Sequence, residues 1–142
     1  MNNKPDLSIV VPIFNEQDNV KKLHAEIVEV LEKLEKPYEI IFVNDGSQDN
    51  TLENCKGLKP LKIINFRRNF GQTAALDAGF KESKGDTVIA MDGDLQNDPR
   101  DIPRLLHKMK LEKLDIVSGW RKSRKDPFSK KLISRGAEWL RK

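Results

Sequence analysis

The stretch VIAMDGDLQNDP, residues 88–99, joins an apolar run to an acidic loop and then to the start of a helix. Its β-branched and apolar beginning is typical of a buried strand. Asp92-Gly93-Asp94 follows at the end of that strand, and the glycine is expected to allow a sharp turn. Asp98-Pro99 has the residue types preferred at a helix N-cap and at the first helical position. The stretch therefore predicts a strand, a polar loop and a helix in direct succession.

Apolar runs with strand character alternate with helical patterns along the rest of the chain. The expected strands are Leu7–Pro12, Tyr38–Val43, Leu61–Phe66, Thr87–Met91 and Asp115–Ser118. Apolar residues recur at helical spacing over 20–34 and 102–109, and further helices are expected over 74–80 and just after Asp49. This alternation predicts an α/β fold with an open, mostly parallel sheet and right-handed crossovers.

Polar residues follow three of the expected strands at the point where each ends. Phe14-Asn15-Glu16 follows the first strand, Asn44-Asp45-Gly46-Ser47 the second and Asp92-Gly93-Asp94 the fourth. The carboxyl ends of parallel strands share one edge of the sheet, where ligands bind. We therefore expect the three clusters to meet in one cleft. The alternative is that they are ordinary turns, which also favour Asp, Asn, Gly and Ser.

The acidic loop offers oxygen atoms as ligands, from the carboxylates of Asp92 and Asp94 and the side-chain amide of Gln96. Mg²⁺ and Mn²⁺ prefer oxygen ligands, and they commonly bind one or two carboxylates together with substrate phosphates. The loop therefore predicts a site for a divalent metal and a diphosphate. A turn whose acids only cap the next helix would account for Asp98 but not for Asp92 or Asp94.

Composition and missing motifs argue against several other classes of function. The chain has 142 residues, of which 34% are charged and 37% hydrophobic, which suits one soluble domain. Its one Cys and two His are too few for a zinc site or a disulfide framework, and they fit a reducing compartment. We expect Cys55 to be a packing residue and His24 and His107 to lie at the surface or its boundary.

Two common nucleotide-binding motifs, G-x-x-x-x-G-K-[ST] and G-x-G-x-x-G after the first strand, are absent from the sequence. An aspartyl-phosphate phosphatase also uses Asp-x-Asp, but normally after the first strand, whereas this pair follows the fourth. No run of residues has the length needed to cross a bilayer, and the polar N-terminus lacks the apolar core of a signal peptide. Phosphate binding is therefore expected to depend on a metal and on side chains.

The net charge of +4 is distributed unevenly. Residues 119–142 carry nine Lys or Arg against two acids, whereas the remainder has a net charge of −3. On a helical wheel the apolar and basic residues of 128–142 occupy opposite halves, which is the pattern of a helix lying in a membrane interface. The alternative is a helix whose apolar face packs on the core. The positive charge favours an anionic membrane surface, and no motif indicates nucleic acid.

Five motifs resemble, in order and spacing, those of family 2 glycosyltransferases: VVPIFNEQDNV (10–20), EIIFVNDGSQDNT (39–51), NFGQTAALDAGF (69–80), AMDGDLQNDP (90–99) and VSGWRKSRKDP (117–127). Within that family they are most similar to polyprenyl-phosphate glycosyltransferases, the group of dolichol-phosphate mannose synthases and bactoprenol glucosyltransferases. The resemblance covers nearly the whole chain. It implies a GT-A fold, with a Rossmann-like open sheet and helices on both faces. We divide the chain into a nucleotide-sugar-binding core, 1–118, and a basic loop and amphipathic helix on the acceptor side, 119–142.

The resemblance also implies which residues would contact a nucleotide-sugar donor. They are Pro12, Phe14, Glu16, Asp45, Ser47, Gly71, Ala75 and Asp92. Among them Asp45 would hydrogen-bond the base, and the small Gly71 and Ala75 would let the donor approach. Asn44 stands where many relatives have Asp.

The remaining implied roles concern the metal, Mg²⁺ or Mn²⁺, and the acceptor. Asp92, Asp94 and Gln96 would hold the metal against the diphosphate. Arg121 and Lys130 would contact the phosphate of the acceptor. Asp94 and Arg121 are the expected catalytic residues.

The implied reaction moves a sugar from a UDP- or GDP-sugar to polyprenyl or dolichyl phosphate at the cytoplasmic face of a membrane, for synthesis of cell-envelope glycans. It is an in-line displacement that inverts the anomeric carbon, and the metal would stabilise charge on the leaving nucleoside diphosphate. A lipid phosphate is already ionised near neutral pH, so positioning matters more than a strong general base.

Two other functions stay open at this point. One is an inactive module that binds nucleotide and membrane, because the sequence ends in mid-helix at Arg141-Lys142 without a Gly or Pro stop signal, which predicts a truncated chain. The other is a family 2 transferase with a saccharide acceptor. That reaction needs a general base to deprotonate a hydroxyl, and none is evident in the sequence.

Overall fold

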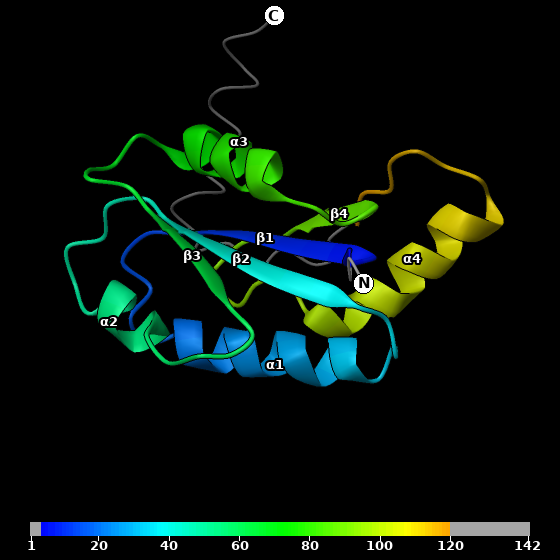
Figure 1. Ribbon diagram of the computed structural model, residues 1–142, viewed down its shortest axis with the longest axis horizontal. Helices are drawn as coiled ribbons and strands as arrows, with labels where there is room; N and C mark the ends of the chain where they lie inside the picture. The colour runs from blue at the N-terminus through cyan, green and yellow to red at the C-terminus, as the bar shows by residue number, and fades with distance from the viewer. Residues whose placement is uncertain (1–3, 120–142) are drawn as a thin grey trace, which may run out of the picture. The chain divides into compact units, whose positions relative to one another are not determined.

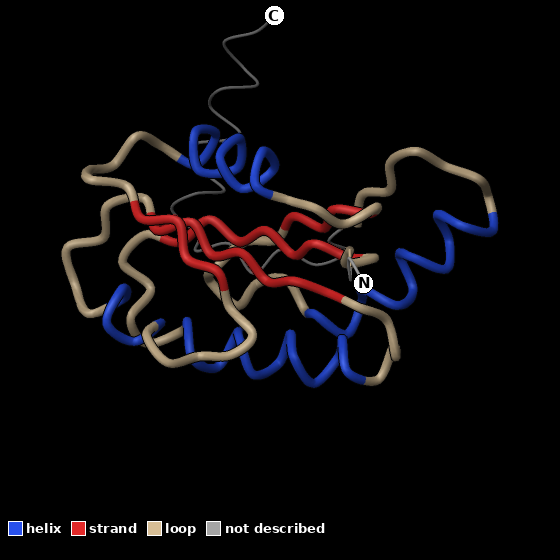
Figure 2. The backbone as a smooth tube through the Cα atoms, in the orientation of Figure 1, coloured by secondary structure: helices blue, strands red, loops and turns tan. Residues whose placement is uncertain are grey.

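The computed structural model describes residues 4–119. Within them, four parallel strands form one sheet in the order β3-β2-β1-β4: β1 is Leu7–Ile13, β2 Tyr38–Asn44, β3 Lys62–Asn65 and β4 Thr87–Ala90. The helices are α1 (Val20–Glu32), α2 (Thr51–Cys55), α3 (Gln72–Glu82) and, after a 3₁₀ turn at Pro99–Asp101, α4 (Ile102–Leu111). All three pairings of these strands are parallel, so the expected parallel α/β architecture is confirmed, and Figure 2 shows the sheet between its helices.

Helices cover both faces of the sheet, as Figure 1 shows, with α3 on one face and α1 and α2 on the other. In β1, alternate side chains point to opposite faces of the sheet. Ile9 and Val11 belong to the large core cluster, the buried apolar side chains between the sheet and α1, whereas Val10 faces α3. All three side chains are 0% exposed. Burial on both faces explains why β1 and β2 read as continuous apolar runs, whereas β3 and β4 are partly exposed.

The large core cluster is filled by one face of α1. Its buried residues recur every three or four positions, as the sequence predicts for an amphipathic helix: Val20, Leu23, Ile27, Val30 and Leu31. Cys55 also packs here, as expected, and burial raises the pKa of its thiol to about 11.

The expectation for His24 is wrong, because its side chain is only 5% exposed. The His24 ring lies edge-on to Phe42, and Nε2 donates to the carbonyl oxygen of Pro60 at 3.0 Å. That hydrogen bond satisfies the polar edge of the ring, so that the residue can occupy the core face of α1. His107 is exposed, as expected.

The fifth expected strand, Asp115–Ser118, is also wrong: these residues have no regular structure. A strand needs a neighbour for its backbone hydrogen bonds, and no strand within residues 4–119 pairs with this segment. The chain forms two compact units, residues 1–106 and 107–142. Our division at residue 118 stays a prediction, since residues 120–142 lie outside the described part.

Gly79 lies where α3 meets the sheet, and a substitution there tests how closely the helix packs on β1 and β2. A Cβ added there would be 2.3 Å from Val10 Cγ1 and 3.2 Å from Val43 Cγ2. Helix propensity alone would make Gly79→Ala stabilising by about 1 kcal/mol. We expect the opposite sign, a loss of about 1–3 kcal/mol in the free energy of unfolding, because α3 must move away from the sheet.

Denaturant unfolding measures this sign. Thr73→Ala, at an exposed position of the same helix, is the matched control and should change the free energy of unfolding by less than about 0.5 kcal/mol. A more stable Gly79→Ala variant would contradict the close packing of α3 on β1 and β2.

Candidate functional site

The loop after β4 lies directly against the end of β1. A Cβ at Gly93 would be 2.9 Å from Ile13 Cγ2 and 3.1 Å from the carbonyl oxygen of Pro12. The residue of this loop with a left-handed backbone is Leu95, at φ 61°. A glycine is therefore needed at residue 93 because a side chain there would collide with β1. The sharp turn that the sequence suggested is not the reason.

The loops after β1 and β2 are joined by reciprocal hydrogen bonds. Asn15 N donates to Ser47 Oγ at 2.9 Å, and Gln48 N donates to the side-chain oxygen of Asn15 at 2.9 Å. Glu16 N donates to Thr51 Oγ1 at 2.7 Å. The structure thus brings all three polar clusters to the same edge of the sheet.

Asp45 ties the end of β2 to the segment that enters α3. Its side chain is buried, and its two carboxylate oxygens accept from Phe70 N at 2.7 Å and Gly71 N at 2.9 Å. Hydrogen bonds to a carboxylate are stronger than those between neutral groups. The carboxylate therefore fixes the chain immediately before α3, and contact of Asp45 with a base stays a prediction.

Asp92 is held from two sides by amide side chains. Gln72 Nε2, at the start of α3, donates to Oδ1 at 3.0 Å, and Asn97 Nδ2, in the acidic loop, donates to Oδ2 at 3.0 Å. The exposed Asp94 accepts from Gln96 N at 3.0 Å. Sequence reasoning missed Gln72 and Asn97, although both lie inside the motifs that it singled out.

The donor set of this loop suits a hard cation that is shared with a phosphate ligand. Within residues 4–119, no group of three or more His, Cys, Asp or Glu is placed to hold a metal. Asp92 and Asp94 supply carboxylate oxygens, and Gln96 could add an amide oxygen. Mg²⁺ and Mn²⁺ bind in this manner where substrate phosphates and water complete the coordination.

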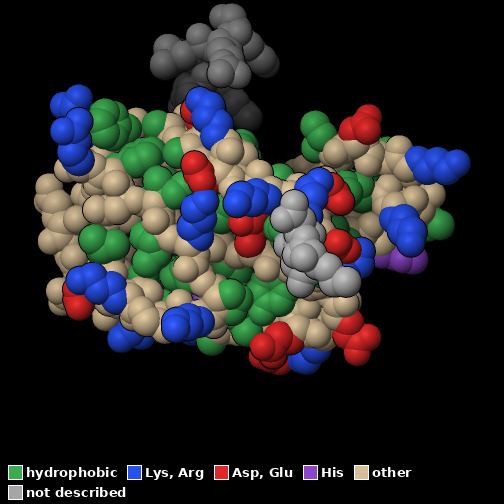
Figure 3. Space-filling view, in the orientation of Figure 1, with side chains coloured by type: hydrophobic (Ala, Val, Ile, Leu, Met, Phe, Trp, Pro, Cys, Tyr) green, Lys and Arg blue, Asp and Glu red, His purple; other side chains and the backbone are tan. Residues whose placement is uncertain are grey.

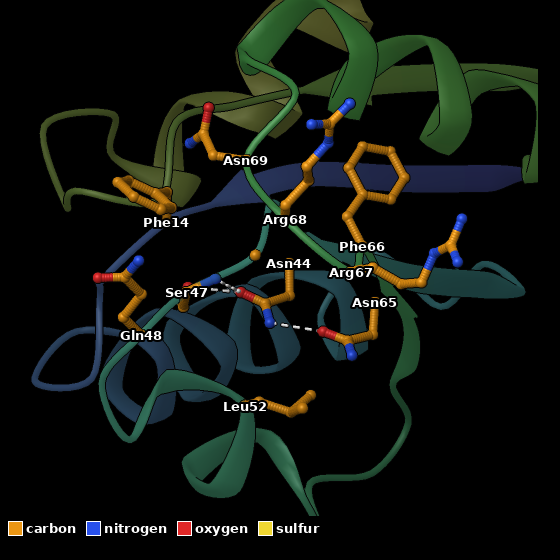
Figure 4. Close-up of a pocket in the computed structure, with 11 residues that line it drawn as sticks. Phe14, Asn44, Ser47, Gln48, Leu52, Asn65, Phe66, Arg67, Arg68 and Asn69 are labelled. Carbon is orange, nitrogen blue, oxygen red and sulfur yellow. Dashed lines mark hydrogen bonds between the residues drawn. The ribbon is translucent and has the colours of Figure 1, made fainter.

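A cleft of about 370 Å³ lies beside the ends of β2 and β3 (Figure 4). Its lining combines aromatic, amide and cationic side chains from Phe14, Asn44, Gly46, Ser47, Gln48, Leu52, Asn65, Phe66, Arg67, Arg68 and Asn69. The Arg68 guanidinium lies 4.8 Å from the centre of the Phe70 ring, which is within the range of a cation–π contact. The aromatic, amide and cationic side chains of the lining suit a planar polar group with negative charge nearby.

Sequence reasoning identified Phe14 and Ser47 of this lining but missed Arg67 and Arg68. It considered the polar residues after three strands and not those after β3, which ends at the same edge of the sheet. The run Phe66-Arg67-Arg68-Asn69 directly after that strand was the available signal.

Other predicted site residues lie elsewhere. Ala75 is fully buried against Ile41 and Val43, so the structure places it in the core under α3 and not in the cleft. Pro12 is partly buried in β1 beside Val43 of β2. Gly71 directly precedes α3. Arg121 and Lys130 lie outside the described residues, as does most of the basic segment 119–142.

The helix cap expected at Asp98 is confirmed. Its carboxylate accepts from Arg100 N at 3.0 Å, with Pro99 at the start of the turn. A hydrogen bond from the Arg100 side chain, together with the one from Arg100 N, lowers the pKa of Asp98. Asp98 therefore has a structural partner of its own, separate from Asp92 and Asp94.

Over the face shown in Figure 3, acidic and basic side chains are interspersed.

Comparison with known proteins finds bacterial relatives that are named for a polyprenyl phosphate and a sugar. Dodecaprenyl-phosphate galacturonate synthase of Rhizobium johnstonii is 44% identical over 142 residues, which cover 95% of this chain and 42% of that protein. Undecaprenyl-phosphate 4-deoxy-4-formamido-L-arabinose transferase of Proteus mirabilis is 37% identical over 134 residues, 91% of this chain and 41% of that protein. The chain thus spans about two fifths of the length of these curated relatives.

Solved glycosyltransferase structures share the fold. A mannosyltransferase from Pyrobaculum calidifontis, in complex with GDP-mannose and Mn²⁺, has a TM-score of 0.56 at 20% identity and matches 69% of this chain and 30% of that one. Glucosyl-3-phosphoglycerate synthase from Mycobacterium tuberculosis, with Mn²⁺ and UDP, has a TM-score of 0.59 at 20% identity, over 74% and 39%. The expected GT-A fold is confirmed. Since the model of glycosyl transferase family 2 matches residues 8–141, the chain belongs to that family.

Proposed function

We propose that this chain contains the donor-binding region of a glycosyltransferase that moves a sugar from a UDP- or GDP-sugar to a polyprenyl phosphate. The observation that carries the proposal is the position of Asp92, where β4, α3 and the acidic loop meet. Membership of the family supports the sugar transfer, and the names of the relatives support the lipid acceptor.

The shape and chemistry of the site support an extended donor. The cleft after β2 and β3 would take the base, with the exposed ring of Phe14 at its edge. Ser47 and Glu16, in the loops after β2 and β1, would lie along the nucleotide between the cleft and the acidic loop. The diphosphate would reach Asp92, Asp94 and Gln96, and Gly71 would lie beside it.

A divalent metal, when bound at the acidic loop, would neutralise negative charge on the leaving nucleoside diphosphate. The chain's own contribution is to hold the ligands in place. Gln72 and Asn97 each donate to one oxygen of Asp92, which restricts rotation of that carboxylate. Correctly oriented ligands lower the barrier because no reorganisation is needed during the reaction.

The basic segment 119–142 supplies the proposed acceptor side. Arg121 and Lys130 would contact the phosphate of the lipid acceptor. The positive charge of the segment would favour an anionic membrane surface on the cytoplasmic side. No helix within residues 4–119 is long and apolar enough to span a bilayer. The amphipathic pattern of residues 128–142 is the ground on which we propose association through a surface helix.

Asp92→Asn and Asp94→Asn test the donor site. Each variant should weaken Mn²⁺-dependent binding of UDP or GDP by at least about tenfold, because a carboxylate that shares the metal with the diphosphate is lost. Isothermal titration of the 142-residue chain with each nucleotide, with and without Mn²⁺, measures this. Asp77→Asn removes the same charge from an exposed position of α3 and should bind like the parent chain. Unchanged affinity in both site variants would remove the acidic loop from the donor site.

Transfer to lipid tests the acceptor. With a radiolabelled UDP- or GDP-hexose, Mn²⁺ and a short polyprenyl phosphate, label should pass into the organic phase, because a lipid phosphate needs no deprotonation before it attacks. In a parallel reaction that contains an oligosaccharide in place of the lipid, label in the oligosaccharide would instead favour a saccharide acceptor. Nucleotide binding without transfer to either acceptor would favour the inactive binding module.

A further inference from the structure

Asn44 is a buried amide that links two sides of the cleft. It closes β2, is 1% exposed, and accepts through its side-chain oxygen from Ser47 N at 3.2 Å and from Ser47 Oγ. Its amide nitrogen donates to the side-chain oxygen of Asn65 at 2.7 Å. The dashed lines in Figure 4 show this connection from the loop after β2 to the end of β3.

The direction of these hydrogen bonds is fixed by the backbone. Ser47 N can only donate, so the Asn44 atom that faces it must be the oxygen. The Asn44 atom that faces Asn65 is then the NH₂ group, and Asn65 must meet it with its own oxygen. The amide nitrogen of Asn65 is consequently the polar atom of that side chain left for a ligand in the cleft.

The neighbouring cations add positive charge but do not point at the same place as the Asn65 amide. The Arg68 guanidinium lies 4.8 Å from the centre of the Phe70 ring, and in Figure 4 the side chains of Arg67 and Arg68 point away from Asn65. The Asn65 amide is therefore the group that presents a donor to a ligand beside it. A base with a carbonyl oxygen at the facing edge satisfies this donor, whereas an amino group at that edge would place donor against donor.

We propose that Asn44 sets the base preference of the donor site by fixing the orientation of the Asn65 amide, so that a base with a carbonyl oxygen at the edge facing Asn65 is favoured over a base with an amino group at that edge. The inference rests on the proposed function, because it takes the cleft as the site of the base. Asn44 touches no ligand in this account and is a positioning residue.

Replacement of Asn44 by Asp reverses the arrangement. A carboxylate of the same shape still accepts from Ser47 N and Oγ, but it has only acceptors to offer Asn65. The Asn65 amide must then turn over and donate, which leaves its oxygen for the ligand. UDP and CDP are the matched probes, because they share ribose and diphosphate and differ at positions 3 and 4 of the pyrimidine: uracil has a donor N3–H and an acceptor O4, whereas cytosine has an acceptor N3 and a donor amino group. The contribution of the metal cancels in the ratio of their affinities.

The experiment is titration of the 142-residue chain and its variants with UDP and with CDP, each in the presence of Mn²⁺. The parent chain should prefer UDP by about tenfold, the effect of one unsatisfied hydrogen bond. Asn44→Asp should bring the ratio of affinities close to one. Asn50→Asp adds the same charge at an exposed position outside the cleft lining and should keep the ratio of the parent chain.

Asn65→Ala provides a second and independent measurement, which can be made even if the Asn44→Asp variant fails to fold. It should lower the ratio, and adding Asn44→Asp to it should change the ratio no further, since the group that is turned over is gone. An unchanged ratio in Asn65→Ala or in folded Asn44→Asp, or equal binding of UDP and CDP by the parent chain, would overturn this inference alone. Absence of binding of either nucleotide to the parent chain would overturn the proposed function with it.

Discussion

The buried carboxylate of Asp45 is the interaction on which the rest of the site depends. It accepts from the backbone N–H groups of Phe70 and Gly71, and so attaches the entrance of α3 to the end of β2. Gln72 is the next residue, and its position allows it to donate to Asp92 beyond β4. One carboxylate in the middle of the sheet thus determines where an acidic group at the edge strand is held.

The parallel sheet provides the setting for this chain of contacts. Because every strand points the same way, each strand delivers the loop that follows it to one edge. The loops then make contacts that sequence distance conceals, such as that of Gly93 with Pro12 and Ile13. The site is consequently built from polar residues that follow β1, β2, β3 and β4, and it needs no glycine-rich phosphate loop.

The sequence predicted the elements whose signal is local. β1, β2 and α1 follow from continuous or periodic apolar residues, and the cap at Asp98 follows from residue type alone. Prediction from the sequence failed where the structure of a segment depends on a partner elsewhere in the chain. Asp115–Ser118 has the composition of a strand but no neighbour among the described residues, and His24 is buried because Pro60, far along the chain, accepts its hydrogen bond. The pairing of Gln72 and Asn97 with Asp92 has the same origin, since amide side chains acquire a role only through folded proximity.

The reciprocal bonds between Asn15 and the Ser47-Gln48 segment have a consequence for the thermodynamics of binding. Two surface loops that would otherwise move independently are held against each other by the protein's own hydrogen bonds. A ligand that enters between them therefore loses little of its interaction energy to the ordering of protein segments. The loops are preorganised, and the same small ordering cost applies to every nucleotide that enters between them.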